Sequence, residues 1–334
     1  MDITLTDGGI ETRIIFDFKR PIGDFEAYQL LADEAGRDIL RRIYQSYAHV
    51  ALRYGLPIQL GTPTWRASRR WTKDVESVNA SAVELLRAVR QQFADARIIL
   101  AGVIGPASDG YATDEALSAD AAFAYHRDQA DFLAGLGVDL LYAPTFPAFS
   151  ELSGVARAIA ETGRPYALAP MLHPNGRMLD GTPLADAIAR IDAEISPRPR
   201  HYMIGCLYPT HAQTALQALR TALRSREARS GIKSERFTPC AQGSRRAGPS
   251  GWDRCPELGS RRIDMCMGVQ SRYSGWLLRH RRALHRGSGQ GGGRSRGIGM
   301  LGTEKCYNFR LAMAERRAAY CMSQGQPTLL LVVH

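Results

Sequence analysis

Strand-like and helix-like segments alternate six times along the first two thirds of this 334-residue chain. Short apolar runs bounded by Gly and Pro predict strands, and longer amphipathic runs predict the helices between them. The predicted strands span residues 3–6, 57–62, 97–106, 138–145, 165–172 and 201–206, and the predicted helices span 28–54, 81–93, 116–136, 150–162, 183–195 and 210–224. Because a helix follows each strand, we expect parallel strands joined by crossover helices.

Two architectures accommodate repeated βα units: an open Rossmann-type sheet and a closed (β/α)8 barrel. The loop after the first predicted strand reads Asp7-Gly8-Gly9 and lacks the GxGxxG pattern of a dinucleotide-binding sheet. Polar and Gly- or Pro-rich loops follow almost every strand at its C-terminal end, where barrel enzymes carry their active sites. We therefore predict an α/β fold of the (β/α)8 TIM-barrel class.

Cys206 lies at the end of the sixth predicted strand, in the sequence HYMIGCLYPTH. A thiol at a strand end, outside an apolar core, is a candidate metal ligand or nucleophile, and the alternative is a small buried residue with a packing role. His126 and His173 are candidate site groups near strand ends, but a lone histidine also satisfies local hydrogen bonds. Trp65 and Trp71 are candidates for lining a substrate entrance, with burial as the alternative.

Six segments within residues 1–233 carry a set of motifs: DGGIET at 7–12, GTPTWRAS at 61–68, GVIGPASDGY at 102–111, YHRDQADF at 125–132, HPNGRMLDGTPL at 173–184 and GCLYPTH at 205–211. In this order they resemble the homocysteine S-methyltransferase family, a group of zinc-dependent thiol methyltransferases built on a (β/α)8 barrel. The resemblance implies a domain over residues 1–233 that transfers a methyl group to the thiol of homocysteine, or to a related thiol or selenol.

The resemblance also assigns roles to residues at the strand ends. In the family the DGG loop holds the amino-acid substrate, and glycine lets backbone amides approach a carboxylate while the aspartate accepts from an ammonium group. Many members carry a Glu-Thr pair after the fourth strand, where this chain reads Ala143-Pro144-Thr145, so the exact thiol stays open. The substrate-binding candidates are Asp7, Gly8, Gly9, Glu11, Thr12 and Thr145.

The family's zinc is bound by three cysteines, one after the sixth strand and an adjacent pair in a Gly-Gly-Cys-Cys sequence after the eighth. The first corresponds to Cys206, and the chain contains no Gly-Gly-Cys-Cys sequence. A free thiol has a pKa of about 8.5, whereas a thiol at the open position of a three-thiolate zinc ion is bound as the thiolate. The resemblance thus implies a zinc cofactor with one of its three ligands present, and no motif marks the methyl donor or other catalytic residues.

The net charge of +10 is confined to one end of the chain. Residues 234–334 hold 17 of the 43 Lys and Arg residues and 6 of the 33 Asp and Glu residues, a net charge of +11, so residues 1–233 carry −1. The basic part has little periodicity, and its widely spaced cysteines do not replace the adjacent pair. One interpretation is a nucleic-acid-binding tail, which predicts salt-sensitive binding that is lost when the tail is removed.

A shifted reading frame is the second interpretation of residues 234–334. Residues 272–281 can be encoded by CGT TAT AGT GGG TGG CTG CTG CGG CAC CGA, which one nucleotide later reads Val-Ile-Val-Gly-Gly-Cys-Cys-Gly-Thr. Residues 234–237, encoded by AGC GAA CGC TTC, begin Ala-Asn-Ala in the same shifted frame and continue 231–233 as a seventh strand. The hypothesis is a frameshift near Lys233, which yields an inactive product without the zinc cysteine pair.

Loss of regular seventh and eighth βα units has a structural consequence. We expect the first and sixth strands to flank a gap whose unpaired edges promote aggregation. The sequence therefore predicts a barrel incomplete at strands 7 and 8, followed by a basic, irregular tail over residues 234–334.

The sequence shows neither a signal peptide nor an apolar segment long enough to span a membrane. Its start, MDITLTDGG, has neither a basic segment nor an apolar signal-peptide core, and the apolar run at 328–333 is too short to cross a bilayer. We expect a cytoplasmic enzyme whose partners are a small-molecule thiol and a methyl donor, with neither a membrane nor a nucleic acid as a partner.

Overall fold

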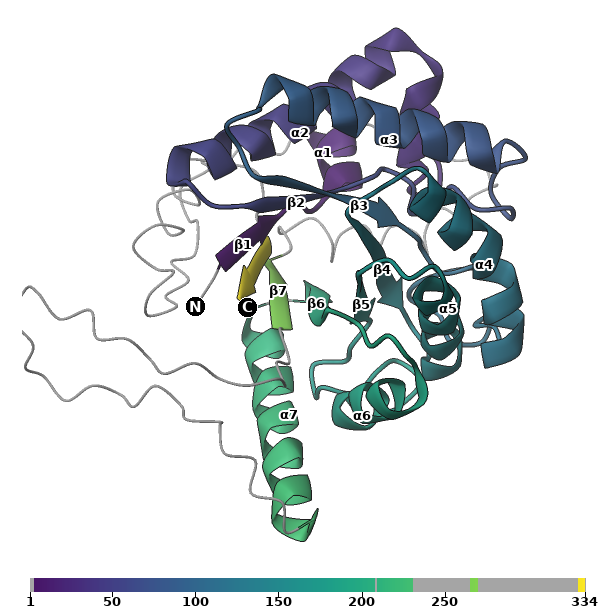
Figure 1. Ribbon diagram of the computed structural model, residues 1–334, viewed down its shortest axis with the longest axis vertical. Helices are drawn as coiled ribbons and strands as arrows, with labels where there is room; N and C mark the ends of the chain where they lie inside the picture. Colours follow the sequence, from purple (N-terminus) through teal and green to yellow (C-terminus); the bar gives the residue numbers. More distant parts are fainter. Residues whose placement is uncertain (1–2, 208, 231–264, 270–329, 334) are drawn as a thin grey trace, which may run out of the picture.

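The computed structural model describes residues 3–207, 209–230, 265–269 and 330–333. Within them the strands form one closed barrel in the order β1 to β8, and the helices lie on its outside (Figure 1). The strands are β1 Ile3–Thr6, β2 Ile58–Gly61, β3 Ile98–Val103, β4 Leu140–Phe146, β5 Tyr166–Pro170, β6 His201–Leu207, β7 Met265–Val269 and β8 Leu330–Val333. The helices are α1 Ile10–Phe16, the 3-10 helix η1 Ala27–Ala32, α2 Glu34–Tyr54, α3 Val75–Gln92, α4 Ala119–Gly135, α5 Phe149–Glu161, α6 Leu184–Glu194 and α7 Pro209–Ser230.

The first six βα units follow the prediction. Neighbouring strands pair in parallel from β1 through β7, so the barrel class is confirmed. The short helix α1 was not predicted, and the helix predicted over 28–54 is divided at Asp33 into η1 and α2. Helix α3 begins at Val75, six residues before the predicted start. The first turns of α3 contain β-branched residues and Asn79, which are weak helix formers. The sequence pattern therefore does not indicate that the helix begins at Val75.

The last two strands close the ring. β7 pairs in parallel with β6, whereas β8 pairs antiparallel with both β7 and β1. The regular (β/α)8 pattern is therefore incomplete at strands 7 and 8, as predicted. The expected gap between the first and sixth strands was wrong, because two short apolar segments of the predicted tail pair with the edges that an open sheet exposes. The rest of that tail lies outside the described residues.

Apolar side chains fill both faces of the sheet. On β3, Ile98 and Leu100 pack in the cluster beneath the helices, whereas Ile99 and Ala101 belong to a separate small cluster, as expected when side chains alternate across a strand. That inner cluster is formed by buried Ala101, Leu140, Ala167, Ala169 and Met203. Small residues dominate it because the interior of a narrow barrel has little room for side chains.

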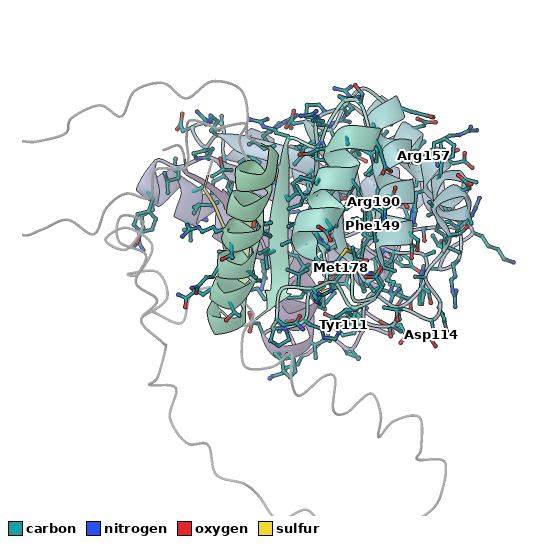
Figure 2. The ribbon with its side chains drawn as sticks, turned by 90° about the horizontal axis from the view of Figure 1, so that it is seen from below. Tyr111, Asp114, Phe149, Arg157, Met178 and Arg190 are labelled. Carbon is teal, nitrogen blue, oxygen red and sulfur yellow. The ribbon has the colours of Figure 1, made fainter. Side chains whose placement is uncertain are left out.

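Local contacts fix the helices on the outside. Asp33 caps α2 by accepting a hydrogen bond from the Gly36 N–H at 2.7 Å, and Gly55, with φ of 61°, ends the helix. The Arg190 guanidinium of α6 lies 4.1 Å from the centre of the Phe149 ring of α5 (Figure 2). No helix among the described residues is both long enough and apolar enough to cross a membrane.

Candidate active site

The loop after β1 places Asp7, Gly8 and Gly9 at the C-terminal end of that strand. An oxygen of the Asp7 carboxylate accepts a hydrogen bond from the Gly61 N–H at 2.8 Å, which ties the loop to the end of β2. The Gly8 carbonyl accepts a hydrogen bond from the Tyr47 hydroxyl on α2. Gly9 has φ of 60°, in the left-handed region that favours glycine, and α1 begins directly after it. The loop is thus held by two neighbouring elements.

Two half-buried carboxylates, Asp7 and Glu11, lie at this end of the barrel, and the charge of Glu11 acts on the ionisation of Asp7. Burial raises the pKa of Asp7 to about 7, the Gly61 N–H opposes this rise, and the charge of Glu11 adds to it. Burial also raises the pKa of Glu11, and the Arg66 guanidinium opposes that rise. Near neutral pH the Asp7 carboxyl exists in both protonation states, so it can accept or release a proton.

Cys206 lies near the C-terminal end of β6, with φ of 57° and a half-buried side chain. The pairing of β6 with β7 shifts register between Ile204 and Leu207, so Cys206 lies in the irregular part of the strand. Burial raises the pKa of its thiol to about 11, a hydrogen bond from the Tyr111 side chain lowers it, and the charge of Glu11 raises it. By itself this thiol is protonated at neutral pH.

Glu11 connects the two parts of the site, because its charge acts on both Asp7 and Cys206. β1 and β6 are separated by β7 and β8 in the ring, so the carboxylates and the thiol come from different sides of the barrel mouth. Glu11 therefore lies within electrostatic influence of both Asp7 and Cys206, and the sequence singled out all three residues. Their roles in binding or catalysis stay predictions.

Sequence reasoning missed a buried cation, Arg66, in the loop after β2. Its side chain is 1% exposed, its guanidinium donates to the Ser108 carbonyl, and it lies 4.2 Å and 4.0 Å from the ring centres of Trp65 and Trp71. The two tryptophans thus pack around this cation. The charge of Arg66 opposes the rise in the pKa of Glu11. An arginine between two tryptophans in a strand-end loop was the available signal.

Thr145 lies in β4 with φ of 64°. Its hydroxyl accepts a hydrogen bond from the Trp65 indole N–H at 2.6 Å and donates one to the Pro144 carbonyl at 2.6 Å. A Cβ atom added to Gly110 would lie 2.8 Å from the Thr145 carbonyl oxygen. Thr145 therefore joins the loops that follow β2, β3 and β4, and its role in substrate binding stays a prediction.

The other sequence candidates occupy different environments. Thr12 is half-buried on α1, one residue after Glu11. His126 is fully buried on α4 and its Nε2 atom lies 3.2 Å from a carboxylate oxygen of Glu151, while His173 is exposed. Burial lowers the pKa of His126, so this histidine is neutral near pH 7 and satisfies an internal hydrogen bond. Local hydrogen bonding, one of the two interpretations of His126, is therefore observed.

The residues near Cys206 do not match the predicted zinc site. Among the described residues, no group of three or more His, Cys, Asp or Glu side chains is arranged to hold a metal ion. The two neighbours that act on the thiol, Tyr111 and Glu11, supply a phenol and a carboxylate, whereas the predicted site requires two further thiolates. In the part of the chain that the structure describes, the zinc ligand set is not complete.

Similar structures support the incomplete barrel. The crystal structure of the homocysteine methyltransferase MmuM from Escherichia coli in its oxidised form has a TM-score of 0.58, with 24% identity over 66% of this chain and 79% of that chain. The metallated form of the same enzyme has a TM-score of 0.57, with 21% identity over 66% of this chain and 80% of that chain. At this level of identity the two structures establish similarity of fold.

Sequence comparison identifies the family. A homocysteine S-methyltransferase of Escherichia coli K12 is 25% identical over 232 residues, which cover 65% of this chain and 74% of the relative. The family model for homocysteine S-methyltransferase matches residues 4–254, which extend past the predicted domain boundary at residue 233. Because this match covers most of the barrel and the loops that carry the site, the chain belongs to the homocysteine S-methyltransferase family.

Proposed function

We propose that this protein transfers a methyl group to the thiol of homocysteine, or of a closely related thiol or selenol. The observation that carries the proposal is that Glu11 acts electrostatically on both Asp7 and Cys206 at the mouth of a barrel of this family. A reaction between two small molecules at the C-terminal end of barrel strands is typical of this architecture.

The charges at the barrel mouth fit an amino-acid thiol. Homocysteine carries an ammonium group, a carboxylate and a thiol, and ionised Asp7 and Glu11 accept hydrogen bonds from an ammonium group. The glycines of the DGG loop leave room for a carboxylate to approach the backbone N–H groups of Gly8 and Gly9. An ammonium group between the two carboxylates lowers the pKa of both, because an opposite charge favours their ionised forms.

The transfer itself needs a thiolate. The substrate S–H bond loses its proton, the sulfur attacks the methyl carbon of the donor, and the bond from that carbon to the donor breaks with its electron pair remaining on the donor. The proton passes to solvent water, because Asp7 and Glu11 are engaged by the substrate ammonium group, which lowers their pKa values. The identity of the donor is left open.

Zinc remains part of the proposal through the family resemblance, and the metallated form of the Escherichia coli relative supports a bound metal. A bound zinc ion supplies a Lewis acid that keeps a thiol deprotonated, and Cys206 is the residue proposed to bind it. Because the described residues do not complete a three-thiolate set, no step is assigned to the metal.

We also propose that residues 1–233 form the methyltransferase domain and that a frameshift begins near Lys233. The shifted codons that restore a Gly-Gly-Cys-Cys sequence support this proposal. The family match to residue 254 and the strand β7 at Met265–Val269 favour the frame as written. The alternative function, which applies if the frameshift is real, is an inactive product that lacks the cysteine pair. A cytoplasmic location stays a prediction.

One experiment tests both proposals. Zinc content and methyl transfer to homocysteine are measured side by side for the chain as written and for a version shifted by one nucleotide after Lys233. Zinc and activity in the shifted version alone support the function and the frameshift. Zinc and activity in the chain as written overturn the frameshift, and no activity in either version overturns the proposed function. Cys206→Ser is the matched control, expected to lose zinc and activity in whichever version has them.

A further inference from the structure

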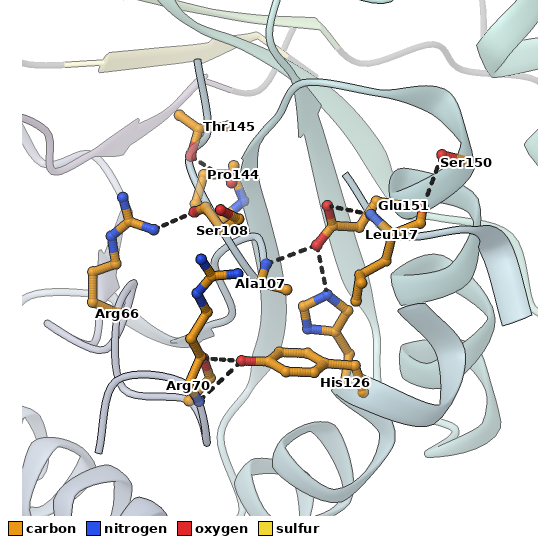
Figure 3. Close-up of polar contacts among 12 residues, drawn as sticks. Arg66, Arg70, Ala107, Ser108, Leu117, His126, Pro144, Thr145, Ser150 and Glu151 are labelled. Atoms are coloured by element: carbon orange, nitrogen blue, oxygen red, sulfur yellow. Dashed lines mark hydrogen bonds and ion pairs between the residues drawn. The ribbon is translucent and has the colours of Figure 1, made fainter. Parts of the chain in front are cut away.

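A single buried carboxylate on an outer helix holds both ends of the loop that follows β3. Glu151 lies in the first turn of α5 and is 1% exposed. One of its oxygens accepts a hydrogen bond from the Ala107 N–H at 2.7 Å, and the other accepts one from the Leu117 N–H at 3.4 Å (Figure 3). The adjacent Ser150 hydroxyl donates to the Leu117 carbonyl at 2.9 Å. Glu151 therefore binds both ends of the loop segment 107–117, and Ser150 adds a further bond at Leu117.

His126 completes the hydrogen bonding of this carboxylate. Its Nε2 atom lies 3.2 Å from the Glu151 oxygen that also binds Ala107 (Figure 3). Because burial lowers the pKa of His126, the ring is neutral near pH 7, and the tautomer with its proton on Nε2 donates to the carboxylate. With that tautomer Glu151 accepts hydrogen bonds from three N–H groups, which satisfy this buried side chain.

The first part of the same loop is also held by residues of the loop after β2. The Ser108 carbonyl accepts from the buried Arg66, and the Ser108 hydroxyl donates to Glu115. A Cβ atom added to Gly105 would lie 2.1 Å from the Trp65 carbonyl oxygen, so the loop and the Trp65 backbone are in close contact. These contacts leave few conformations open to the loop.

The loop carries a side chain of the candidate site. Tyr111 hydrogen-bonds the Cys206 side chain, and its own N–H donates to an Asp109 carboxylate oxygen at 3.1 Å. Tyr111 and Asp114 lie at the same edge of the molecule (Figure 2). Tyr111 lies between Ala107 and Leu117, the two residues whose N–H groups Glu151 binds.

We infer that Glu151 is a positioning residue of the active site: by holding Ala107 and Leu117, it fixes the place of Tyr111 beside Cys206. Glu151 acts through the loop and has no contact with substrate in this role. Its importance for substrate binding rests on the proposed function, whereas its effect on the loop does not.

The test uses Glu151→Gln, which keeps the size of the side chain. The amide oxygen can accept from one loop N–H, but the amide NH2 group then faces the other, so one end of the loop is released. Hydrogen exchange at the amides of residues 107–117 is expected to become at least about tenfold faster. A fluorine label on the Tyr111 ring is expected to give one sharp resonance in the unmodified protein and a broadened or divided one in the variant. Glu161→Gln, an exposed position on the same helix, is the matched control.

Measurement of homocysteine affinity tests whether the effect of Glu151 on the loop reaches the candidate site. The affinity is expected to fall about tenfold in Glu151→Gln, and in a Tyr111→Phe background the same change is expected to have no further effect, since both act on one contact. If the losses of homocysteine affinity in Glu151→Gln and Tyr111→Phe add up in the double variant, Glu151 does not act through Tyr111. Unchanged exchange and an unchanged fluorine resonance overturn the anchoring role.

If Glu151→Gln does not fold, Glu151→Asp, whose shorter side chain cannot reach both N–H groups, is judged by the same measurements. An unmodified protein that binds no homocysteine contradicts the proposed function, and the exchange and fluorine measurements still decide the role of Glu151.

Discussion

The Tyr111 side chain hydrogen-bonds the side chain of Cys206 and so joins the loop after β3 to the end of β6. The bond favours the ionised thiol, in opposition to burial and to the charge of Glu11. Since the net result is a pKa of about 11, the surroundings of Cys206 keep it protonated and unreactive until a cation or metal ion is present.

Replacing Tyr111 with Phe is expected to raise the pKa of Cys206 further, because the variant loses the hydrogen bond that stabilises the thiolate. In metal-free protein the alkylation of Cys206 by iodoacetamide should therefore slow, and its pH profile should move to higher pH. The measurement is the rate of modification of the peptide that contains Cys206, followed by mass spectrometry. Tyr54→Phe, at the end of α2, is the control, and an unchanged profile in Tyr111→Phe contradicts the contact.

The Asp7 carboxyl makes stability depend on pH. Its pKa is about 7 in the folded protein, against an ordinary value of 3.8, so between these values the folded state binds more protons than the unfolded state. Stability contributed by the protonated carboxyl is therefore lost as the pH rises from about 4 to about 7. Asp7→Asn removes this titration and is expected to be more stable than the unmodified protein at pH 8, with weaker homocysteine binding.

Urea unfolding of Asp7→Asn at a series of pH values between about 4 and 8 checks this expectation. The control is Asp95→Asn, which alters an exposed carboxyl and should leave the profile unchanged. A steeper profile in Asp7→Asn than in the unmodified protein contradicts the raised pKa of Asp7.

Most of the barrel could be predicted because the period of apolar residues reports burial locally. The pairing of β8 with β7 and β1 could not, since it depends on which sheet edges remain available after residues far away in the chain have folded. Asp7, Glu11 and Cys206 were identified through motifs. Arg66 and Glu151 were missed because a single charged residue has no periodic signal, and its burial depends on partners supplied by other loops.

Arg66→Lys tests the buried cation between the tryptophans. Lysine keeps the charge but loses the planar group that lies over Trp65 and Trp71 and donates to Ser108. We expect a loss of roughly 1–3 kcal/mol in the free energy of unfolding, measured in urea. Arg70→Lys, at an exposed ion pair with Glu115, should change it by less than about 0.5 kcal/mol. Equal effects of the two substitutions contradict a special role for Arg66.

Two glycines should respond to alanine in opposite directions. A Cβ atom at Gly105 would lie 2.1 Å from the Trp65 carbonyl oxygen, so Gly105→Ala forces the two loops apart and should cost about 1–3 kcal/mol. At Gly135, in the last turn of α4, a Cβ atom meets nothing within 4 Å. Gly135→Ala should therefore stabilise the helix by about 0.5–1 kcal/mol. Thermal unfolding of both variants checks the signs, and destabilisation of equal size by both contradicts the close contact at Gly105.

The closing strands can be tested by shortening the chain. Removal of all residues after Ser230 deletes β7 and β8 and leaves the edges of β1 and β6 unpaired, so we expect aggregation, measured by light scattering at equal protein concentrations. Gly268 of β7 pairs with Leu330 of β8, so a short Gly/Ser linker in place of residues 270–329 keeps both strands in the ring. That control is expected to stay monomeric and dispersed. If the two shortened chains behave alike, the edges of β1 and β6 are not protected by these strands, and the predicted open gap is the correct description.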